Sequence, residues 1–319
     1  NGYKKYSIIF LETIYTIFFY EVYIMTIRHL KTFITVAECG KMRKAAELLY
    51  ISQPSVSQAI RELEEYYNVK LFERISQKLH ITSEGLLFLS HAQHIVDSFD
   101  NMELAMKNIG KSTKIRIGGS VSVGTYLMND IVERLENKMQ NIDIFVTINN
   151  TFEIENMISR SELDVAIVEG IIKNPDIVKI PFCEDELVMV VGKAHPFYSK
   201  NQLTLLDLEG QSLLSREAGS SDRNQFEQFL AEHNINVVKK WTCTNTEAIK
   251  NAVTNGKGIA ILSKMLINNE CKKGKLKILS FRDVSIKRQI KLIYHKNKYI
   301  SKSIEELIDI CSSFNMSSK

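Results

Sequence analysis

The sequence lacks the motifs that mark most enzyme active sites. Gly118-Gly119-Ser120 does not have the G-x-G-x-x-G or G-K-[ST] spacing of a phosphate-binding loop. There is no G-x-S-x-G nucleophile elbow, and the seven histidines do not cluster. We therefore predict no enzyme activity, no cofactor and no metal site, and keep an α/β enzyme as an alternative only.

Cysteine is scarce, and the five residues are scattered through the chain. Their number is odd and their spacing does not resemble that of a metal site. This usage fits a reducing cytoplasm and buried thiols. A redox-sensing pair is a minor alternative, because nothing in the sequence marks a thiol of low pKa. The cysteines are Cys39, Cys183, Cys243, Cys271 and Cys311.

A strong charge of one sign is also missing, because the net charge is only +4 over 319 residues. The distribution is more informative than the total. Between Met25 and Thr82 there are nine basic and six acidic residues, so most of the net charge lies on this segment. The length allows two or three domains, and 45% apolar with 24% charged residues is typical of a globular protein.

Residues 6–24 form an apolar run that is nearly long enough to span a bilayer. Glu12 and Glu21 interrupt the run, and no small-residue cleavage site follows it. We interpret residues 1–24 as an upstream extension that is not part of the fold. A membrane anchor is the minority alternative, and we expect no membrane partner.

Residues 45–64 have the apolar periodicity of two helices joined by a very short turn. Ser52 is a natural N-cap for the second helix, and Pro54 is tolerated because it falls in the first helical turn. Two helices joined in this way form a helix-turn-helix. The apolar positions are Ala45, Ala46 and Leu49 in the first helix and Val56, Ile60 and Leu63 in the second.

The opposite face of the second helix carries polar, mostly uncharged side chains at its N-terminal end. Glutamine can pair with adenine, arginine with guanine, and serine with bases or phosphate. The alternative is an ordinary helical hairpin with a solvated face, but such a face would favour Glu and Lys. The polar residues are Gln53, Ser55, Ser57, Gln58 and Arg61.

From Met25 to about Leu89 the sequence resembles the winged helix-turn-helix of LysR-type transcriptional regulators. The resemblance implies an N-terminal winged helix-turn-helix, a long linker helix that pairs two subunits, and a C-terminal periplasmic-binding-protein-like effector domain of two subdomains. The matching motifs are Leu30-Lys31-Thr32-Phe33, Ala45-Ala46-Glu47-Leu48-Leu49, Ser52-Gln53-Pro54-Ser55-Val56-Ser57, Ile60-Arg61-Glu62-Leu63-Glu64, Leu71-Phe72-Glu73-Arg74 and Ile81-Thr82-Ser83-Glu84-Gly85.

The expected domains are therefore the DNA-binding domain at 25–83, the linker helix at 84–110 and the effector domain at 114–319. Within the last, subdomain I covers about 114–184 and 288–319, and subdomain II about 185–287. The chain crosses between them near 182–186 and 284–289.

In the DNA-binding domain we expect a first helix from Ile27 to Cys39 and a short hairpin, the wing, at 76–81. Arg74 and Lys78 are placed to meet phosphate, although Arg74 could instead pair with a neighbouring glutamate. The family commonly has an aromatic and a small hydroxyl residue before Ala45, where this chain has Met42-Arg43-Lys44. The candidate DNA-binding residues are Arg43, Lys44, Ser52, Gln53, Pro54, Ser55, Ser57, Gln58, Arg61, Arg74 and Lys78.

Thr82 is expected to cap a long helix that runs to about Ile109, followed by a hinge at 110–113. No part of the small wing domain could cover its apolar stripe, so we predict self-association as a homodimer or homotetramer. The stripe consists of Leu86, Leu89, Ala92, Ile95, Val96, Phe99, Met102 and Met106.

From Lys114 onward strands and helices alternate, which predicts an α/β fold with a mainly parallel sheet. Expected strands lie at 115–119, 142–148, 163–168, 186–191, 212–215, 237–242, 259–262 and 289–294. Expected helices lie at 126–139, 152–159, 222–232, 247–254 and 303–314.

Several of these strands end in polar residues that open helices, and ligands bind at such ends in α/β sheets. Hydroxyl groups and helix N-termini favour an anion, although each Ser or Thr could be only an N-cap. Arg216 is a candidate counter-charge, with an ion pair to Glu217 or Asp222 as the alternative. Asp222 stands where related regulators commonly have Thr, which counts against an anion. The candidate effector-binding residues are Ser120, Ser122, Asn150, Thr151, Glu169, Arg216, Ser220, Ser221 and Thr246.

Three motifs after Ser212 resemble regulators of cysteine biosynthesis and carbon fixation within the same family. They are residues 215–223, 247–253 and Gly256-Lys257-Gly258-Ile259-Ala260. The sequence thus predicts a cytoplasmic regulator that binds double-stranded DNA, a small effector, other copies of itself and, if it is an activator, RNA polymerase. The alternative is an α/β enzyme or solute-binding protein with a helical hairpin that does not read bases.

Overall fold

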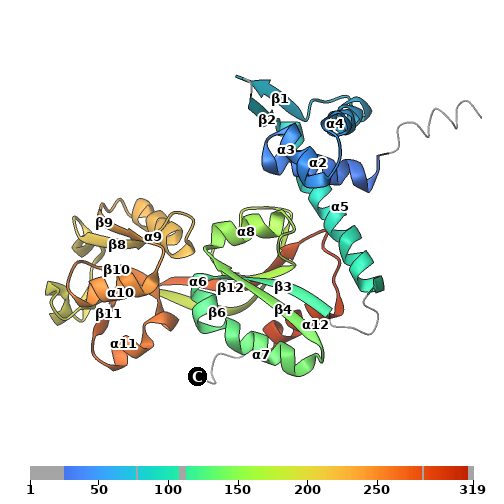
Figure 1. Cartoon of the computed structure of the whole chain (residues 1–319). Helices are drawn as coiled ribbons and strands as arrows, with labels where there is room; N and C mark the ends of the chain where they lie inside the picture. The colour runs from blue at the N-terminus through green and yellow to red at the C-terminus, as the bar shows by residue number, and fades with distance from the viewer. Residues whose placement is uncertain (1–24, 77, 108–112, 282–283, 315–319) are drawn as a thin grey trace, which may run out of the picture. The chain divides into compact units, whose positions relative to one another are not determined.

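A computed structural model describes residues 25–76, 78–107, 113–281 and 284–314. The chain forms two compact units, Asn1–Lys107 and Asn108–Lys319 (Figure 1). The expected extension at 1–24, the tip of the wing at Gln77 and most of the expected hinge lie outside the described residues. Within the described ranges, no helix is both long and apolar enough to cross a membrane.

The first unit contains four helices and one hairpin among its described residues. They are α2 (Ile27–Cys39), α3 (Met42–Leu49), α4 (Gln53–Tyr67), β1 (Phe72–Ile75), β2 (Lys78–Ile81) and α5 (Ser83–Lys107). Gly40 ends α2 with a φ of 65°, and Tyr50 turns the chain between α3 and α4 with a φ of 54°. Ser52 caps α4, since its Oγ accepts a hydrogen bond from Ser55 N at 3.2 Å.

Phe33 lies at the centre of the core of this unit, with 0% of its surface exposed. Its ring is 5.2 Å from that of Phe72 and 4.8 Å from that of Phe88, measured between centroids. The same core contains the apolar stripe of α4, including Val56, Ile60 and Leu63. The wing and α5 are therefore packed on the same side chains that position the helix-turn-helix.

The wing begins earlier than expected. Its first strand is Phe72–Ile75 and Ser76 is part of the turn, with a φ of 48°, so the prediction that the hairpin starts at Ser76 is wrong. The cause is Glu64, whose carboxylate accepts hydrogen bonds from the backbone N–H groups of Leu71 at 2.9 Å and Phe72 at 3.2 Å. These bonds fix the point at which the chain leaves α4 for β1.

Helix α5 starts directly after Thr82, whose Oγ1 accepts a hydrogen bond from Gly85 N at 2.9 Å. Ala92 is buried, and Leu89 and Val96 pack against the core of the same unit. The expectation that this unit could cover none of the stripe is therefore wrong, because α2 covers part of it. The exposed apolar residues are Leu86, Leu87, Ile95, Met102 and Met106, with 45–67% of their surface exposed.

The second unit is an α/β fold of two lobes. Lobe I contains β3 (Thr113–Ser120), α6 (Val121–Tyr126), α7 (Met128–Lys138), β4 (Ile142–Asn149), α8 (Thr151–Ser159), β5 (Val165–Glu169) and α12 (Lys302–Ser312). Lobe II contains β7 (Gln202–Leu203), β8 (Ser212–Arg216), α9 (Ser221–Glu232), β9 (Val238–Cys243), α10 (Thr246–Thr254), β10 (Ala260–Ser263), α11 (Asn268–Lys272) and β11 (Leu276–Phe281), with short 3-10 helices at 196–199, 205–208 and 264–266.

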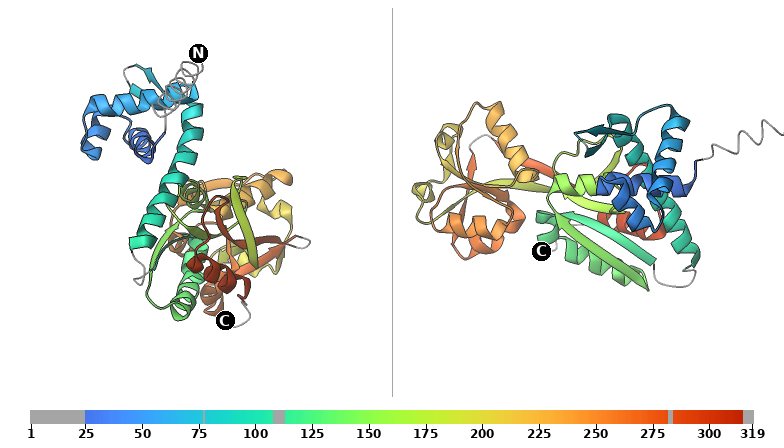
Figure 2. Two further views of the ribbon diagram at one scale, coloured as in Figure 1. Left: turned by 90° about the vertical axis from the view of Figure 1, so that its right-hand side faces the viewer. Right: turned by 45° about the horizontal axis from the view of Figure 1, so that its top comes forward.

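Two long strands, β6 (Ile177–Gly192) and β12 (Ile286–His295), connect the lobes (Figures 1 and 2). They pair antiparallel from Ile286 opposite Leu187 to His295 opposite Ile177. The main sheet has the order β4-β3-β5-β12-β6-β11-β7, with β10 also paired to β6. Pairing is parallel among β3, β4 and β5 but antiparallel where β10, β11 and β12 meet β6 and where β12 meets β5. The expectation of a mainly parallel sheet is therefore wrong, because the two long connecting strands run in opposite directions between the lobes.

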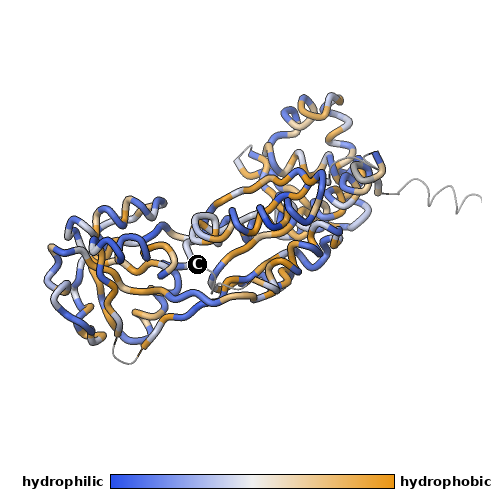
Figure 3. Tube along the Cα trace, turned by 90° about the horizontal axis from the view of Figure 1, so that it is seen from below, coloured by the Kyte–Doolittle hydropathy of each residue, from blue (hydrophilic) through white to orange (hydrophobic). Residues whose placement is uncertain are grey.

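Helices cover both faces of lobe I. Residues of α7 and α12 share a hydrophobic core with β3, β5 and β12, and residues of α8 pack on the opposite face. In lobe II, α9 and α10 belong to two different cores in the same way. Hydrophobic residues concentrate along the strands between these helices (Figure 3).

Helix α6 and strand β11 of this unit were not expected from the sequence. The helix expected at 126–139 is found as α7, and α6 precedes it and meets it at Leu127, where φ is −112°. Strand β11 was not expected, because lysines at 272, 273, 275 and 277 hide its apolar positions. The sheet accommodates Lys277, whose Nζ donates to the carbonyl oxygens of Tyr198 at 2.8 Å and Lys200 at 2.6 Å.

Candidate DNA-binding surface and effector crevice

The expected base-reading residues lie together on the N-terminal half of α4. Gln53, Pro54, Ser55, Gln58 and Arg61 are exposed, and Ser57 is half-buried. The opposite side of the helix is held in the core, so this face is presented outward by a rigid element. An N-terminal face of this composition can enter the major groove and donate or accept hydrogen bonds at base edges.

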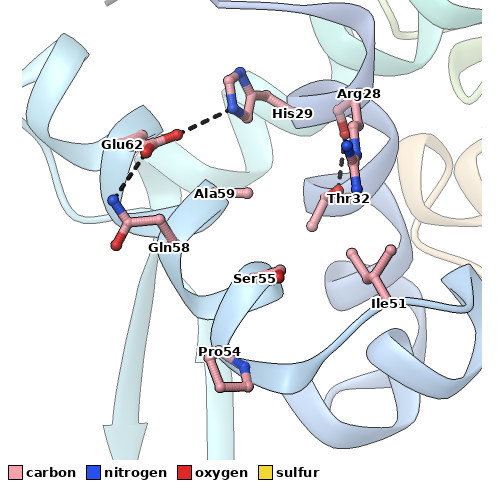
Figure 4. A pocket seen from close by; sticks show the side chains of 9 residues that line it. All are labelled: Arg28, His29, Thr32, Ile51, Pro54, Ser55, Gln58, Ala59 and Glu62. Atoms are coloured by element: carbon pink, nitrogen blue, oxygen red, sulfur yellow. Dashed lines mark hydrogen bonds and ion pairs between the residues drawn. The ribbon is translucent and has the colours of Figure 1, made fainter. Parts of the chain in front are cut away.

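A chain of polar contacts positions one of these side chains (Figure 4). His29 Nε2 lies 3.1 Å from Glu62 Oε2, and Gln58 Nε2 donates to Glu62 Oε1 at 2.8 Å. A shallow cavity of about 480 Å³ separates α2 from α4 here and includes Arg28 in its lining. Thus α2 sets the orientation of Gln58, and Arg28 adds a positive charge beside it.

The residues that we expect to contact phosphate groups are all exposed. Arg43 pairs with Glu47 at 3.2 Å, but both side chains are mostly exposed, so this pair stabilises little. No described residue forms an ion pair with Lys44, Arg74 or Lys78, so the alternative of a Glu partner for Arg74 is not observed within the described ranges. These cations are available to phosphate groups.

Tyr50 was missed by the sequence interpretation. It is 95% exposed, although tyrosine normally buries its ring, and it lies in the turn directly before α4. Its position in the turn does not by itself predict exposure, because the next residue, Ile51, packs against the core.

A buried arginine that the sequence interpretation also missed lies where the two lobes of the second unit meet. Arg288 on β12 lies opposite Asp185 on β6, and its Nε is 2.7 Å from Asp185 Oδ2. Arg288 Nη1 is 2.5 Å from Asp222 Oδ1 and 3.8 Å from Glu169 Oε1. The cluster thus joins α9 of lobe II, β5 of lobe I and both connecting strands.

Hydroxyl groups complete this cluster. Ser120 Oγ donates to Glu169 Oε2, and Arg288 Nη2 lies 3.5 Å from Ser122 Oγ. Burial raises the pKa of Glu169, and the negative charges of Asp222 and Asp185 act in the same direction. The positive charge of Arg288 opposes this shift without cancelling it. Burial also acts to lower the pKa of Arg288, but the three carboxylates outweigh it and the pKa lies above its usual range.

Beside the cluster, a cavity of about 360 Å³ lies between α8 and α9. Thr151, Phe152, Gly219 and Ser221 line it from both lobes. The lobes approach closely at this point, because Phe152 N donates to Gly219 O at 3.2 Å. A side chain at Gly170, where φ is 90°, would collide with Ser221 Oγ. This cavity is of the size that holds a small metabolite.

The structure brings together five of the nine predicted effector residues at this place: Ser120, Ser122, Thr151, Glu169 and Ser221. The other four have different surroundings. Asn150 caps α8 by accepting from Glu153 N at 3.0 Å, and its side chain lies against Gly219 of the cavity lining. Arg216 is bound by both carboxylate oxygens of Glu217 at 2.9 Å and donates to Thr246 Oγ1 at 3.2 Å. Ser220 is the buried N-cap residue of α9 and has no side-chain cap hydrogen bond.

Two of the buried or half-buried cysteines have thiols of low reactivity. All five are free, and burial raises the pKa of Cys183 and of Cys311 to about 12. A thiol of such high pKa is almost fully protonated at neutral pH and is a poor nucleophile. Among the described residues, no group of His, Cys, Asp or Glu side chains is arranged to hold a metal ion.

A winged helix-turn-helix unit joined to a two-lobed unit with a crevice defines the class of ligand-responsive DNA-binding regulators. Two sequence families match the chain: "Bacterial regulatory helix-turn-helix protein, lysR family" at residues 27–86 and "LysR substrate binding domain" at residues 109–314. The chain belongs to the LysR family of transcriptional regulators, and it is a regulator rather than an enzyme.

Individual relatives agree with this assignment. A probable RuBisCO transcriptional regulator of Phaeodactylum tricornutum is 31% identical over 88% of this chain and 94% of its own length. The regulator CysL of Bacillus subtilis is 27% identical over 89% of this chain and 96% of its own. A full-length OxyR variant from Pseudomonas aeruginosa has the same fold, with a TM-score of 0.66, 21% identity and coverage of 91% and 96%. The expected resemblance to regulators of cysteine biosynthesis and carbon fixation is confirmed by the first two.

Proposed function

We propose that α4 reads the edges of base pairs in the major groove while the wing and the start of α3 hold the phosphate backbone. The observation that carries this proposal is the exposed polar face of α4, in which Gln58 is oriented by Glu62 and His29. Arg61 is exposed and has no ion pair within the described part of the chain. A free guanidinium at this position suits a bidentate contact with guanine.

We further propose that a small metabolite binds between the lobes of the second unit and shifts the population of open and closed lobes. Supporting this, Thr151 and Ser221 line one cavity from opposite lobes. A change in lobe closure would alter how subunits present their wings to DNA in the cytoplasm. If the protein is an activator, RNA polymerase is the partner that would respond.

The proposal for DNA predicts that Arg61→Ala weakens binding to specific DNA by about 10–100-fold, equivalent to about 1–3 kcal/mol for a lost base contact. The measurement is a gel-shift titration of the chain from Met25 against DNA from directly upstream of its own gene, at two salt concentrations. Wild-type retention is expected to be specific and to weaken as salt rises, because phosphate contacts release counterions.

Arg160→Ala is the matched control, since it removes one exposed arginine from the second unit, where its pair with Glu162 is long at 3.9 Å. It should leave the affinity unchanged. Non-specific retention that is the same in the wild-type chain and the Arg61→Ala chain would show that α4 does not read bases.

Self-association through α5 gives a separate prediction. Ile95→Lys places a charge among the exposed apolar residues of this helix and should convert an assembled homodimer or homotetramer to smaller species. Light scattering after size exclusion measures this directly. Lys107→Ile, at the charged end of the same helix, is the control and should not reduce the mass of the assembly. If Ile95→Lys also leaves the mass unchanged, α5 is not part of the interface.

A further inference from the structure

The buried cluster beside the cavity contains three carboxyl groups and one guanidinium group. The side chain of Arg288 is 0% exposed, and those of Glu169, Asp185 and Asp222 are at most 4% exposed. Asp185 is the direct strand partner of Arg288, so these two charges balance each other. Glu169 and Asp222 then share a single guanidinium nitrogen, at 3.8 Å and 2.5 Å.

The same place has hydrogen-bond acceptors without donors. Asp222 Oδ2, Ser221 Oγ and Gln225 Oε1 are buried and have no hydrogen-bond partner. A carboxylate oxygen can only accept, so Asp222 Oδ2 can take a hydrogen bond from a donor group of a ligand, whereas the hydroxyl of Ser221 can either accept or donate. Buried polar groups are rarely left unpaired, because each has given up its hydrogen bonds with water.

These acceptors lie beside the cavity between α8 and α9. Ser221 and Gln225 line it, and Asp222 follows Ser221 at the start of α9. On the other lobe, Thr151 also lines it and its Oγ1 donates to Glu169 O at 3.5 Å. The charged groups of the lining are the carboxylates of Glu155 and Glu227 and the ammonium of Lys173. Glu227 is paired with Arg223 at 2.9 Å and Lys239 at 2.6 Å, so the excess of carboxyl groups lies in the buried cluster.

We propose that this crevice binds a small ligand that carries a protonated amine, and that Asp222 is the residue that excludes anions. The inference rests on the proposed effector role of the same crevice and assigns its ligand class. An ammonium group offers three donors and one positive charge, which match the unpaired acceptors and the excess carboxylates. An anion would meet the carboxylate of Asp222, which already occupies the nitrogen of Arg288 that could bind it.

The test is the melting temperature of the full chain at constant ionic strength with three probes: ethanolammonium chloride, sodium phosphate and sodium chloride as the reference. The ammonium salt is expected to raise the wild-type melting temperature by about 2–4 °C at saturation, while phosphate does not. Asp222→Asn should abolish the ammonium response and create a phosphate response, because the variant releases Arg288 Nη1 from its charged partner.

Asp309→Asn is the matched control, because it removes an exposed carboxylate on α12 and should respond as the wild type does. Stabilisation of the wild-type chain by phosphate would overturn the proposal. So would an Asp222→Asn chain that responds to both probes as the wild type does. Gel shifts on the same preparations test the DNA-binding proposal separately. Specific DNA retention without an Asp222-dependent change in melting temperature would contradict the ligand assignment but not the proposal for DNA.

Discussion

Arg288→Met is expected to lower the free energy of unfolding of the second unit by about 3–5 kcal/mol. The substitution keeps most of the aliphatic volume but removes the only cation in contact with Glu169, Asp185 and Asp222 among the described residues. Removing one partner of a buried ionic group leaves uncompensated charge in a medium that solvates it poorly. Urea unfolding followed by a probe of the second unit measures the loss.

Lys287→Met is the matched control on the same strand. Lys287 is exposed and adjacent to Arg288, so its substitution should change stability by no more than about 0.5 kcal/mol. Adding Asp222→Asn to Arg288→Met should recover part of the lost stability, because one of the uncompensated carboxylates is then replaced by a neutral amide. Equal stability of the Arg288→Met and Lys287→Met chains would mean that the carboxylates do not depend on the arginine.

The sequence predicted the helix-turn-helix well because its signals are local. The periodicity of α4 and the cap at Ser52 operate within a few residues, and α2 was expected at the residues where it is found. The start of the wing was predicted wrongly because it depends on Glu64, seven residues before Leu71, accepting a backbone hydrogen bond. A contact of this kind leaves no periodic signal.

The centre of the crevice was not predictable from neighbouring residues for the same reason. The interpretation located the segments that connect the lobes, but Asp185 and Arg288 are 103 residues apart and meet only through the register of β6 and β12. In a single sequence, a charged strand residue that is buried in the fold cannot be distinguished from one that faces solvent. Arg216 is the opposite case, because its ion-pair partner is adjacent in the sequence. Glu217 was one of its two expected partners, and the structure shows this pair.

Phe33→Ala is expected to destabilise the DNA-binding unit by about 3–5 kcal/mol, the usual cost of emptying a buried aromatic site. Phe33 is fully buried, and its ring contacts those of Phe72 at the wing and Phe88 on α5. The loss should therefore loosen the wing, α2 and α5 together and reduce DNA binding, although Phe33 itself is not on the DNA-binding face.

Hydrogen exchange resolves this effect by unit, because the two units are separately compact. Amides of α2 and α4 should lose protection in Phe33→Ala while those of β5 and β6 keep it. Phe145→Ala serves as the control, since this phenylalanine of β4 is half exposed and its removal leaves little cavity. An equal loss of protection in both units would mean that they unfold cooperatively. Ligand binding in the second unit would then change the stability of the DNA-binding unit through this coupling.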